Sequence, residues 1–457
     1  MEQKDLPIAL GTEKIGKLLM QYAIPAIIAM TASSLYNITD SIFIGHGVGA
    51  LAISGLALTF PLMNLAAAFG SLVGVGAATL MSVRLGQKDY DTANKILGNV
   101  FVLNIILGLA YTVVVLSFLD PILYFFGASD ATLPYAHQYM EVILLGNVVT
   151  HMYLGLNALL RSTGRPQKAM YATLCSVLIN IVLNPLFIFV FKWGIQGSAF
   201  ATVISQTVML VWQINIFSSK KHFIHLKKGT FRLQRKIVVD SLSIGLAPFL
   251  MNAASCVIVV IINQGLIHYG GDLAVGAYGI VNRVVFLFVM ITMGFNQGMQ
   301  PIAGYNYGAG QYARVTEVLK KTILSATIVM TSGFLIGELF PHAVASVFTT
   351  DKKLIGLAVE GLRIVFIFFP IVGFQMVTSN FFQSIGMSGR AIFLSMTRQL
   401  LFLIPCLLIL PPLFGVRGVW FSMPSADLAA SIVSAFMLSS QFRQFKKHAA
   451  TQEVRGL

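Results

Sequence analysis

Oxygen-bearing side chains recur inside the long apolar segments of this chain, and one of them is a carboxylate. Asp40 lies near the end of the first such segment, which spans residues 18–44. Asn180 and Asn184 lie one helical turn apart in a later segment, and Thr202 lies in the segment that follows. A carboxylate with amide and hydroxyl oxygens suits a hard cation such as Na⁺, or a proton. These residues therefore form a candidate ion site.

The first apolar segment is longer than a bilayer requires. Its 27 residues would make about 40 Å of helix at roughly 1.5 Å per residue, whereas about 20 residues cross the hydrocarbon core. A carboxylate there is costly unless it is paired or hydrated, so Asp40 is a functional candidate. The alternative is that Asp40, five residues before Gly45, is a solvated helix end. Pro25 predicts a kink, which is either a harmless irregularity or a point of bending.

The composition indicates a polytopic membrane protein. The chain has 457 residues, of which 56% are hydrophobic and 11% charged, and its mean hydropathy is +0.79; soluble domains are about 25% charged. The polar N-terminus is not followed by a short apolar stretch with a cleavage site, so we expect no cleaved signal peptide. Cys175, Cys256 and Cys406 each lie alone in apolar runs, which indicates neither a metal site nor a disulfide framework.

About twelve apolar runs are long enough to span a membrane, and turn-forming polar breaks separate them. The expected spans are 15–45, 51–83, 96–119, 134–160, 169–191, 195–217, 237–268, 273–305, 316–340, 354–384, 391–413 and 416–440.

An internal repeat relates the two halves of the chain. At an offset of 222 residues, Ser162-x-Gly164 matches Ser384-x-Gly386, and at 221 residues Gly194-x-x-Gly197 matches Gly415-x-x-Gly418. The longest polar stretch, 218–236, falls at the midpoint and is basic and amphipathic.

We therefore expect an N-terminal six-helix half at 1–217, a cytoplasmic basic linker at 218–236 and a C-terminal six-helix half at 237–457. The predicted fold is an all-α membrane protein with twelve transmembrane helices in two pseudo-symmetric six-helix bundles. Transporters built from two such halves bind cargo between them and alternate access by rocking.

Basic residues are concentrated in alternate loops. The loops after the even-numbered spans and the terminal segments hold most of them, and the opposite loops hold only Lys192, Lys352, Lys353 and Arg417. The positive-inside rule then places both termini in the cytoplasm, in a multi-pass protein of the cell (cytoplasmic or inner) membrane. The net charge of +14 thus reflects topology and contact with anionic membrane lipids rather than nucleic-acid binding.

Four runs carry a family resemblance: YNITDSIFIGHGVGALAISGLA (36–57), TGRPQKAM (163–170), NIVLNPLFIF (180–189) and KWGIQGSAFAT (192–202). They resemble multidrug and toxic compound extrusion (MATE) transporters, and the similarity covers essentially the whole chain. It is greatest to the DinF-like and MepA-like bacterial branch. The resemblance implies export of bulky organic small molecules, often cationic or amphipathic, coupled to H⁺ or Na⁺ and needing no other cofactor.

The resemblance also implies roles for individual residues. Asp40, Asn180 and Thr202 would bind the coupling cation, as metal ligands if that ion is Na⁺. The other members of the cluster are Asn184 and the supporting residues Tyr36, Tyr139 and Asn157. Some relatives have a second acid where this chain has Asn184. Because fewer negative charges weaken Na⁺ binding, H⁺ and Na⁺ both remain possible coupling ions. The alternative for the asparagines is hydrogen bonding that holds helices together.

The second half does not repeat this site. At the offset of 222, Asp40 falls on Ile262 and Asn180 on Phe402, which indicates that the first half carries the coupling ion. Candidates for lining the cargo cavity, or alternatively for satisfying helix kinks, are Asn263, Gln297, Gln300 and Asn380. Glu360 can reach Arg363 at the i,i+3 spacing of a helix.

Other functions fit less well. The chain has no GxxxxGK[ST] motif for an ATP-driven pump, and its eight histidines are scattered, which argues against an enzyme. A lipid or lipid-linked precursor flippase and an uncoupled channel are the alternatives. We expect a secondary antiporter, monomeric and without an obligate protein partner, in which the charge of Asp40 controls bending of the first helix near Pro25.

Overall fold

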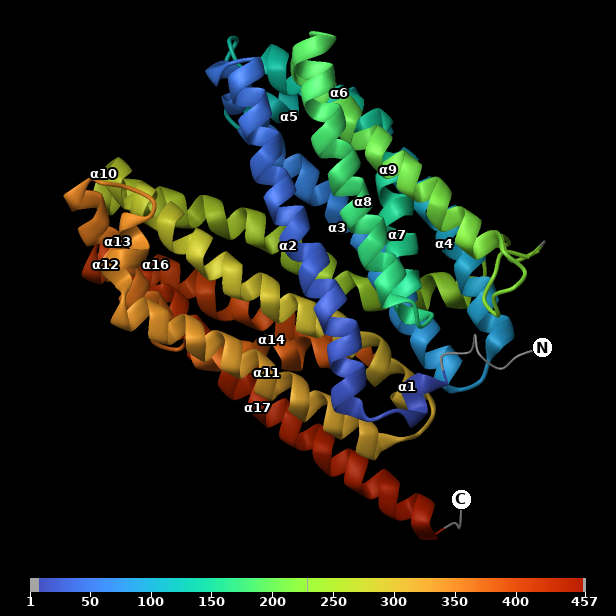
Figure 1. Ribbon diagram of the computed structural model, residues 1–457. Helices are drawn as coiled ribbons and strands as arrows, with labels where there is room; N and C mark the ends of the chain where they lie inside the picture. Colours follow the sequence, from blue (N-terminus) through green and yellow to red (C-terminus); the bar gives the residue numbers. More distant parts are fainter. Residues whose placement is uncertain (1–7, 228, 455–457) are drawn as a thin grey trace. The chain divides into compact units, whose positions relative to one another are not determined.

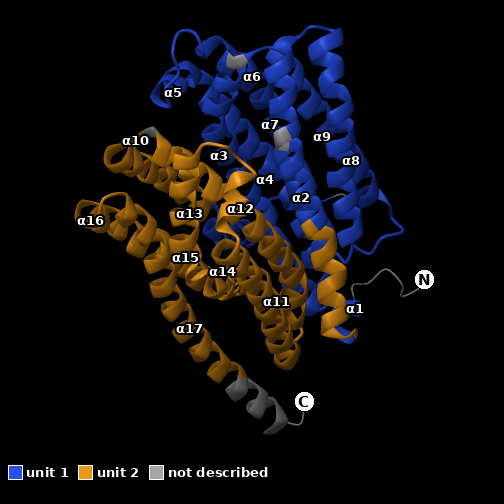
Figure 2. Ribbon diagram, turned by 60° about the vertical axis from the view of Figure 1, so that its left-hand side comes forward, with its two compact units in different colours: residues 1–12, 28–249 blue, residues 13–27, 250–457 orange. Residues whose placement is uncertain are grey.

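The computed structural model describes residues 8–227 and 229–454, and every regular element within them is helical (Figure 1). The chain divides into two compact units (Figure 2). Unit 1 comprises Met1–Thr12 and Ile28–Phe249, and unit 2 comprises Glu13–Ile27 and Leu250–Leu457. Helices α2 and α10 each contribute to both units.

Unit 1 contains the first six predicted spans and two short helices. Its elements are α1 (Ala9–Thr12), most of α2 (Ile15–Gly47), α3 (Ala50–Gly86), α4 (Tyr90–Ser117), α5 (Leu119–Phe125), α6 (Leu133–Leu145), α7 (Asn147–Ser162), α8 (Pro166–Pro185), the π-helix η2 (Leu186–Val190), α9 (Gly194–Ser218) and the start of α10 (Arg235–Gly308).

Unit 2 contains the other six spans, together with the start of α2. Its further elements are the remainder of α10, α11 (Tyr312–Leu339), α12 (Pro341–Ser346), α13 (Lys352–Phe366), α14 (Phe369–Ser384), α15 (Ser388–Met396), the π-helix η3 (Thr397–Leu403), α16 (Ile404–Phe414) and α17 (Val416–Val454).

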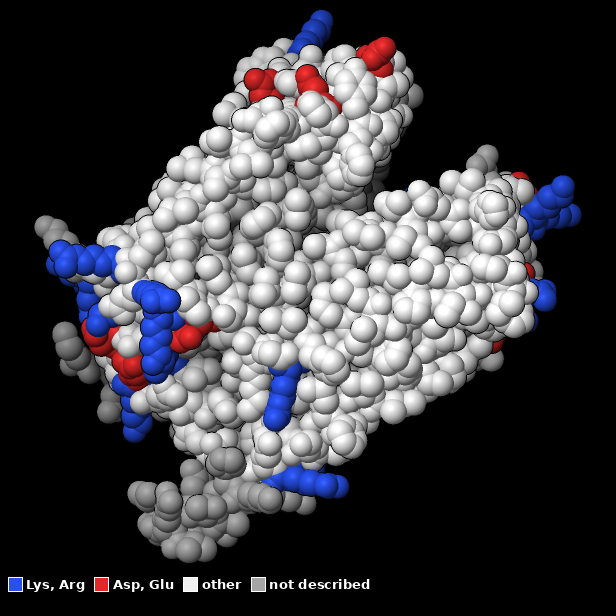
Figure 3. All heavy atoms as spheres, turned by 180° about the vertical axis from the view of Figure 1, so that it is seen from behind, with Lys and Arg blue, Asp and Glu red and all other residues white. Residues whose placement is uncertain are grey.

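Among the described residues, ten helices are long and apolar enough to cross a membrane, or up to twelve if each of two bent pairs is one span. On the face drawn in Figure 3, broad areas carry no charged side chain, and most of the charges lie toward its edges. This distribution fits a hydrocarbon environment around the middle of the spans. The predicted all-α membrane fold is confirmed.

Two spans that the sequence presents as continuous are bent. Helices α6 and α7 meet at 56°, and α13 and α14 meet at 54°. At the first bend, a Cβ on Gly146 would lie 2.4 Å from Val203 Cγ2, so α9 packs where only glycine fits. At the second, Pro370 lies in the first turn of α14, where its missing N–H costs nothing.

The repeat is visible in the backbone. Gly164 and Gly386 have φ of 87° and 78°, and Gly194 and Gly415 have φ of 58° and 61°. Glycine adopts these left-handed conformations without the steric cost that a side chain adds. Matched turns therefore begin the fifth and sixth spans of each half. Gly271 (φ 67°) similarly separates the two spans within α10.

Candidate ion and substrate sites

Three elements of unit 1 converge at the end of α2. A Cβ on Gly47 of α2 would lie 2.2 Å from Ile188 Cγ2, and one on Gly197 of α9 would lie 3.0 Å from Phe187 Cβ. Both neighbours belong to η2, the π-helical continuation of α8. Glycine thus lets α2 and α9 approach η2 closely, which brings the polar residues of all three elements together.

Asp40 is buried in this contact, with 5% of its surface exposed. Its Oδ1 accepts hydrogen bonds from Asn184 Nδ2 on α8 and from Ser198 Oγ on α9. Hydrogen bonds to a carboxylate are stronger than those between neutral groups. The pairing that a carboxylate needs within a membrane span is therefore present.

The hydrogen bonds continue from Asp40 around the three helices. Asn184 Nδ2 also donates to Asn180 Oδ1 (3.4 Å), and Asn180 Nδ2 donates to Thr202 Oγ1 (3.2 Å). The Tyr36 hydroxyl lies 2.6 Å from Thr202 Oγ1. Since Tyr36 is one turn before Asp40 on α2, the network returns to the helix on which it starts.

The two remaining supporting residues have different surroundings. Tyr139 of α6 is 1% exposed and lies near enough to Asp40 and Tyr36 to interact with them electrostatically. Asn157 Nδ2 donates to Ala169 O (3.1 Å) and to Thr173 Oγ1 (3.3 Å), and its Oδ1 accepts from Arg161 Nη1 (2.7 Å). Asn157 thus joins α7 to the first turns of α8.

Oxygen acceptors remain at the site. Asn184 Oδ1 is buried without a hydrogen-bond partner among the described residues, and no donor to Asp40 Oδ2 is found there either. Nowhere among the described residues do three or more His, Cys, Asp or Glu form a group that could hold a metal ion. The site can therefore bind a proton on Asp40, or a small cation through one carboxylate with amide and hydroxyl oxygens.

Pro25 lies within α2, in the portion that belongs to unit 2. A Cβ on Gly294 would lie 2.3 Å from Ile27 Cγ1, and one on Gly298 would lie 2.7 Å from Ala23 N. These glycines, one turn apart on α10, let α2 pack closely on either side of Pro25. The proline lacks an N–H for the helix ladder, so this segment bends more readily than its neighbours.

The proposed cavity residues lie on two helices of unit 2. Asn263, Gln297 and Gln300 are on α10, and Gln300 is buried. Asn380 is on α14, where its backbone O (2.7 Å) and Oδ1 (3.3 Å) accept from Ser384 Oγ.

Sequence reasoning missed Ser198, although it lies four residues before Thr202 and so shares its helix face. It also missed the ion pair of Arg398 and Asp427, which their location in apolar spans would have indicated. The expected contact of Glu360 with Arg363 is wrong: Glu360 Oε1 accepts from Arg417 Nε of α17. The spacing of residues along one helix predicts only partners on that helix, and it cannot predict a partner on a neighbouring helix.

Comparison with known families identifies the fold. The MatE family profile matches residues 25–186 and 245–408. The chain belongs to the MatE family. The multidrug export protein MepA of Staphylococcus haemolyticus is 29% identical over 426 residues, which cover 93% of this chain and 94% of MepA.

Solved structures agree with this assignment. A MATE transporter in the bent conformation superposes with a TM-score of 0.92 at 25% identity, covering 97% of this chain and 99% of the other. An outward-facing multidrug resistance MATE transporter gives 0.90 at 25% identity, covering 98% and 100%. The resemblance noted in the sequence is thus confirmed. This MatE protein is therefore a multi-pass membrane protein and a transporter, not an enzyme.

Proposed function

We propose that this MatE transporter is a secondary antiporter that exports organic, often cationic or amphipathic, small molecules in exchange for H⁺ or Na⁺ at Asp40. The observation that supports this proposal is the burial of Asp40 at the junction of α2, α8 and α9, where Asn184 and Ser198 hold one of its oxygens. A membrane-buried carboxylate that can gain and lose a cation is the feature that coupling requires.

The hydrogen bonds favour a proton over Na⁺ as the coupling ion. Asn184 and Ser198 both act as donors toward Asp40 Oδ1, whereas a Na⁺ ligand must turn an oxygen toward the ion. Na⁺ could contact Asn184 Oδ1, which has no hydrogen-bond partner among the described residues. However, the side chains bonded to Asp40 are neutral, so Na⁺ would have one negatively charged ligand and would be held weakly. A proton needs only Asp40 Oδ2, which leaves the network in place.

Neutralising Asp40 would change how tightly α2 is held. Its bonds from Asn184 and Ser198 are charge-assisted while the carboxylate is ionised, and protonation weakens them. The other end of α2 packs on α10 of unit 2 around Pro25. Gain of a proton therefore frees α2 to bend near Pro25, reshapes the first half and releases cargo outward.

The antiporter proposal includes the architecture and setting of the chain. Residues 1–217 and 237–457 are the two halves that rock, and 218–236 links them on the cytoplasmic side. Both termini lie in the cytoplasm, and the chain works as a monomer in the cell membrane. The linker residues 218–236 have no acidic side chain, so their basic groups face anionic lipid headgroups.

The test is efflux of a fluorescent organic cation from cells producing the wild type, Asp40→Asn or the control Asp130→Asn. Asp130 is exposed and bonds only to Tyr124 (2.9 Å) among the described residues. Each is measured with and without Na⁺, and with the proton gradient collapsed. We expect Asp40→Asn to lose efflux at least tenfold, the control to be normal, and wild-type efflux to follow the proton gradient. Normal export by Asp40→Asn would refute the proposal. Wild-type efflux that depends on Na⁺ alone would identify Na⁺, and not H⁺, as the coupling ion.

A further inference from the structure

A second polar site lies in unit 2, where η3 interrupts the span between α15 and α16. Arg398 Nε on η3 donates to Asp427 Oδ1 on α17 at 2.5 Å. π-Helical turns are uncommon and frequently occur at functional sites. The family profile ends at residue 408, so Asp427 lies beyond the matched region.

The pair is costly to place within a membrane span. Asp427 is 5% exposed, and a buried ion pair generally gives no more stability than apolar residues of the same volume. Charged residues inside membrane spans accordingly tend to serve substrate or ion pathways. Packing alone does not account for Arg398 and Asp427.

Only some of the hydrogen-bond donors of the Arg398 guanidinium have a partner among the described residues. Of its donors, only Nε has a hydrogen-bond partner among the described residues, and 31% of the side chain is exposed. Exposure to lipid would leave a charged fork in hydrocarbon, so the open part faces water or a ligand. The two Nη groups form the planar fork that binds a carboxylate in a bidentate manner.

Neighbouring polar atoms also lack partners. Gln399 Nε2 donates to Ser255 Oγ (3.1 Å), but Gln399 Oε1 is buried with no partner within the described chain. The same holds for Ser431 Oγ, one helical turn after Asp427. Buried polar groups are normally hydrogen-bonded, so these atoms are polar positions whose hydrogen bonds the described chain leaves unmade.

An aromatic residue completes the surroundings of Arg398. Tyr278 of α10 lies near enough to interact with its charge, and the Tyr278 ring is 6.2 Å from that of Trp420, measured between centroids. Trp420 is buried and Tyr278 is partly exposed. An exposed edge of an aromatic ring beside a charged fork suits an aromatic compound that bears an acidic group.

The repeat shows how this site differs from the one at Asp40. The first, fifth and sixth spans of the first half supply Asp40, Asn184 and Ser198. The corresponding spans of the second half supply Ser255, the residues of η3, and Asp427. In the second half, however, the cation that faces the acid is the tethered guanidinium of Arg398. The second site therefore needs no free cation and presents a positive group instead.

We propose that Arg398, oriented by Asp427, binds the carboxylate of amphoteric aromatic compounds that this transporter exports. The proposal deepens the export function proposed above and rests on it. Arg398 then determines specificity, because compounds without the carboxylate gain nothing from the fork and are exported without it.

The experiment uses two xanthene dyes that differ in one group: a dye with a free benzoate, and its methyl ester. Their efflux from cells is compared for the wild type, Arg398→Gln, Arg398→Lys and the double variant Arg398→Gln/Asp427→Asn. Binding of each dye to the purified full-length protein is followed by fluorescence anisotropy. The double variant removes both charges and so avoids leaving Asp427 unpaired, which protects the test against a folding defect.

We expect Arg398→Gln and the double variant to weaken binding and efflux of the benzoate about tenfold relative to the ester, a loss typical of one charged hydrogen-bonded contact. Arg398→Lys keeps the charge but lacks the planar fork, so its binding and efflux of the benzoate should lie between those of the wild type and Arg398→Gln. An equal loss for both dyes in every variant, or no loss of the benzoate, would overturn the proposal. Export of neither dye by the wild type would instead contradict the export function itself.

Discussion

Ser198 and Asn184 donate to the same oxygen of Asp40, so the contribution of each to the site can be separated by substitution. Only Ser198 belongs to α9, whereas Asn184 belongs to α8. Removing the Ser198 hydroxyl therefore breaks the bond from Asp40 to α9 and keeps the bond to α8. Removing the Asn184 amide does the reverse.

Ser198→Ala should destabilise the protein by about 2 kcal/mol, the range for a hydrogen bond to a charged group, and should slow efflux without abolishing it. Thermal unfolding in detergent measures the first effect and dye efflux the second. Thr207→Ala is the matched control, because the exposed Thr207 hydroxyl donates only to Val203 O of its own helix (2.7 Å). Equal effects of the two substitutions would contradict the role of Ser198.

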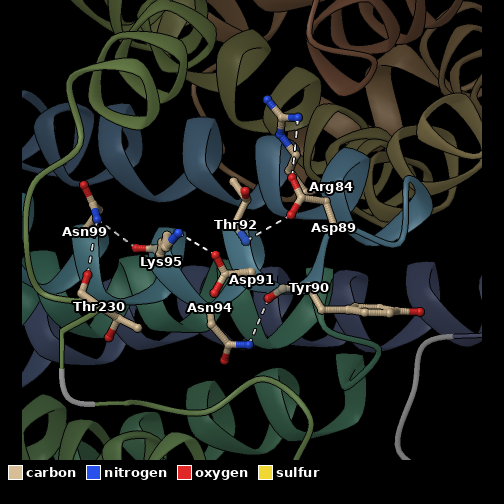
Figure 4. Close-up of polar contacts among 9 residues, drawn as sticks. All are labelled: Arg84, Asp89, Tyr90, Asp91, Thr92, Asn94, Lys95, Asn99 and Thr230. Carbon is tan, nitrogen blue, oxygen red and sulfur yellow. Dashed lines mark hydrogen bonds and ion pairs between the residues drawn. The ribbon is translucent and has the colours of Figure 1, made fainter.

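The segment of unit 1 that follows α9 is hydrogen-bonded to α4. Asn99 is fully buried; its Nδ2 donates to Thr230 O (3.3 Å) and Arg232 O (3.1 Å), and its Oδ1 accepts from Gln234 N (2.9 Å). Figure 4 shows Asn99 facing Thr230 from α4. A Cβ on Gly98 would lie 2.2 Å from Thr230 O. Asn99 therefore holds residues 230–234 against α4, and earlier in the same segment His225 N donates to Asn94 Oδ1 (3.0 Å) on that helix.

Asn99→Ala should release the linker, because three backbone groups lose their partner together. We expect faster hydrogen exchange and faster proteolysis at residues 229–235, with little change in α4 itself. Asn104→Ala serves as the control, since Asn104 is buried on the same helix but has no hydrogen bond to the linker within the described chain. Unchanged exchange in Asn99→Ala would show that the hydrogen bonds of Asn99 are not what holds residues 230–234.

The start of α4 is sensitive to pH outside the membrane. Asp89 is its N-cap and accepts from Thr92 N at 3.2 Å (Figure 4). Partial burial raises the pKa of the Asp89 carboxyl, but the hydrogen bonds from Thr92 and the charges of Arg84 and Lys95 outweigh it and lower the pKa overall. Because this pKa is lower in the folded state, the cap stabilises α4 above about pH 4 and is lost as the pH falls further.

Asp89→Ala should therefore lower stability by about 1 kcal/mol near neutral pH, and its difference from the wild type should shrink below about pH 4. Thermal unfolding across this range tests both expectations. Asp91→Ala, which removes an exposed acid paired with Lys95 in the same turn, should change stability by less than about 0.5 kcal/mol. A difference for Asp89→Ala that stays constant with pH would contradict the assignment.

At the scale of the whole molecule, the distribution of basic residues predicts which side of the membrane each loop faces. Lys221 in the linker and Lys353 at the start of α13 are both exposed. In a variant without the three native cysteines, Lys353→Cys should react with a membrane-impermeant maleimide in intact cells. Lys221→Cys should react only after permeabilisation. The reverse pattern would place the termini outside the cytoplasm.

The two halves share spans and turns but differ in their polar sites. Matched glycines with positive φ begin equivalent helices, whereas Asp40 has neutral partners and Asp427 has Arg398. A duplicated scaffold thus carries one site suited to a mobile cation and one with a tethered cation. Under the two proposals made above, this division allows coupling and recognition of an acidic cargo group to change independently.

The membrane class, the approximate positions of the spans and the candidacy of Asp40 could be predicted from the sequence, because each depends on hydropathy and on the cost of charge in hydrocarbon. The twelve predicted spans correspond to ten long apolar helices and two bent pairs in the described chain. The structure was needed to show which side chains meet: Ser198 with Asp40, Arg417 with Glu360, and Arg398 with Asp427. The bends at α6–α7 and α13–α14 likewise became visible only in the structure. Lipid is as apolar as the protein core, so the apolar pattern of a span does not show which face its neighbours cover.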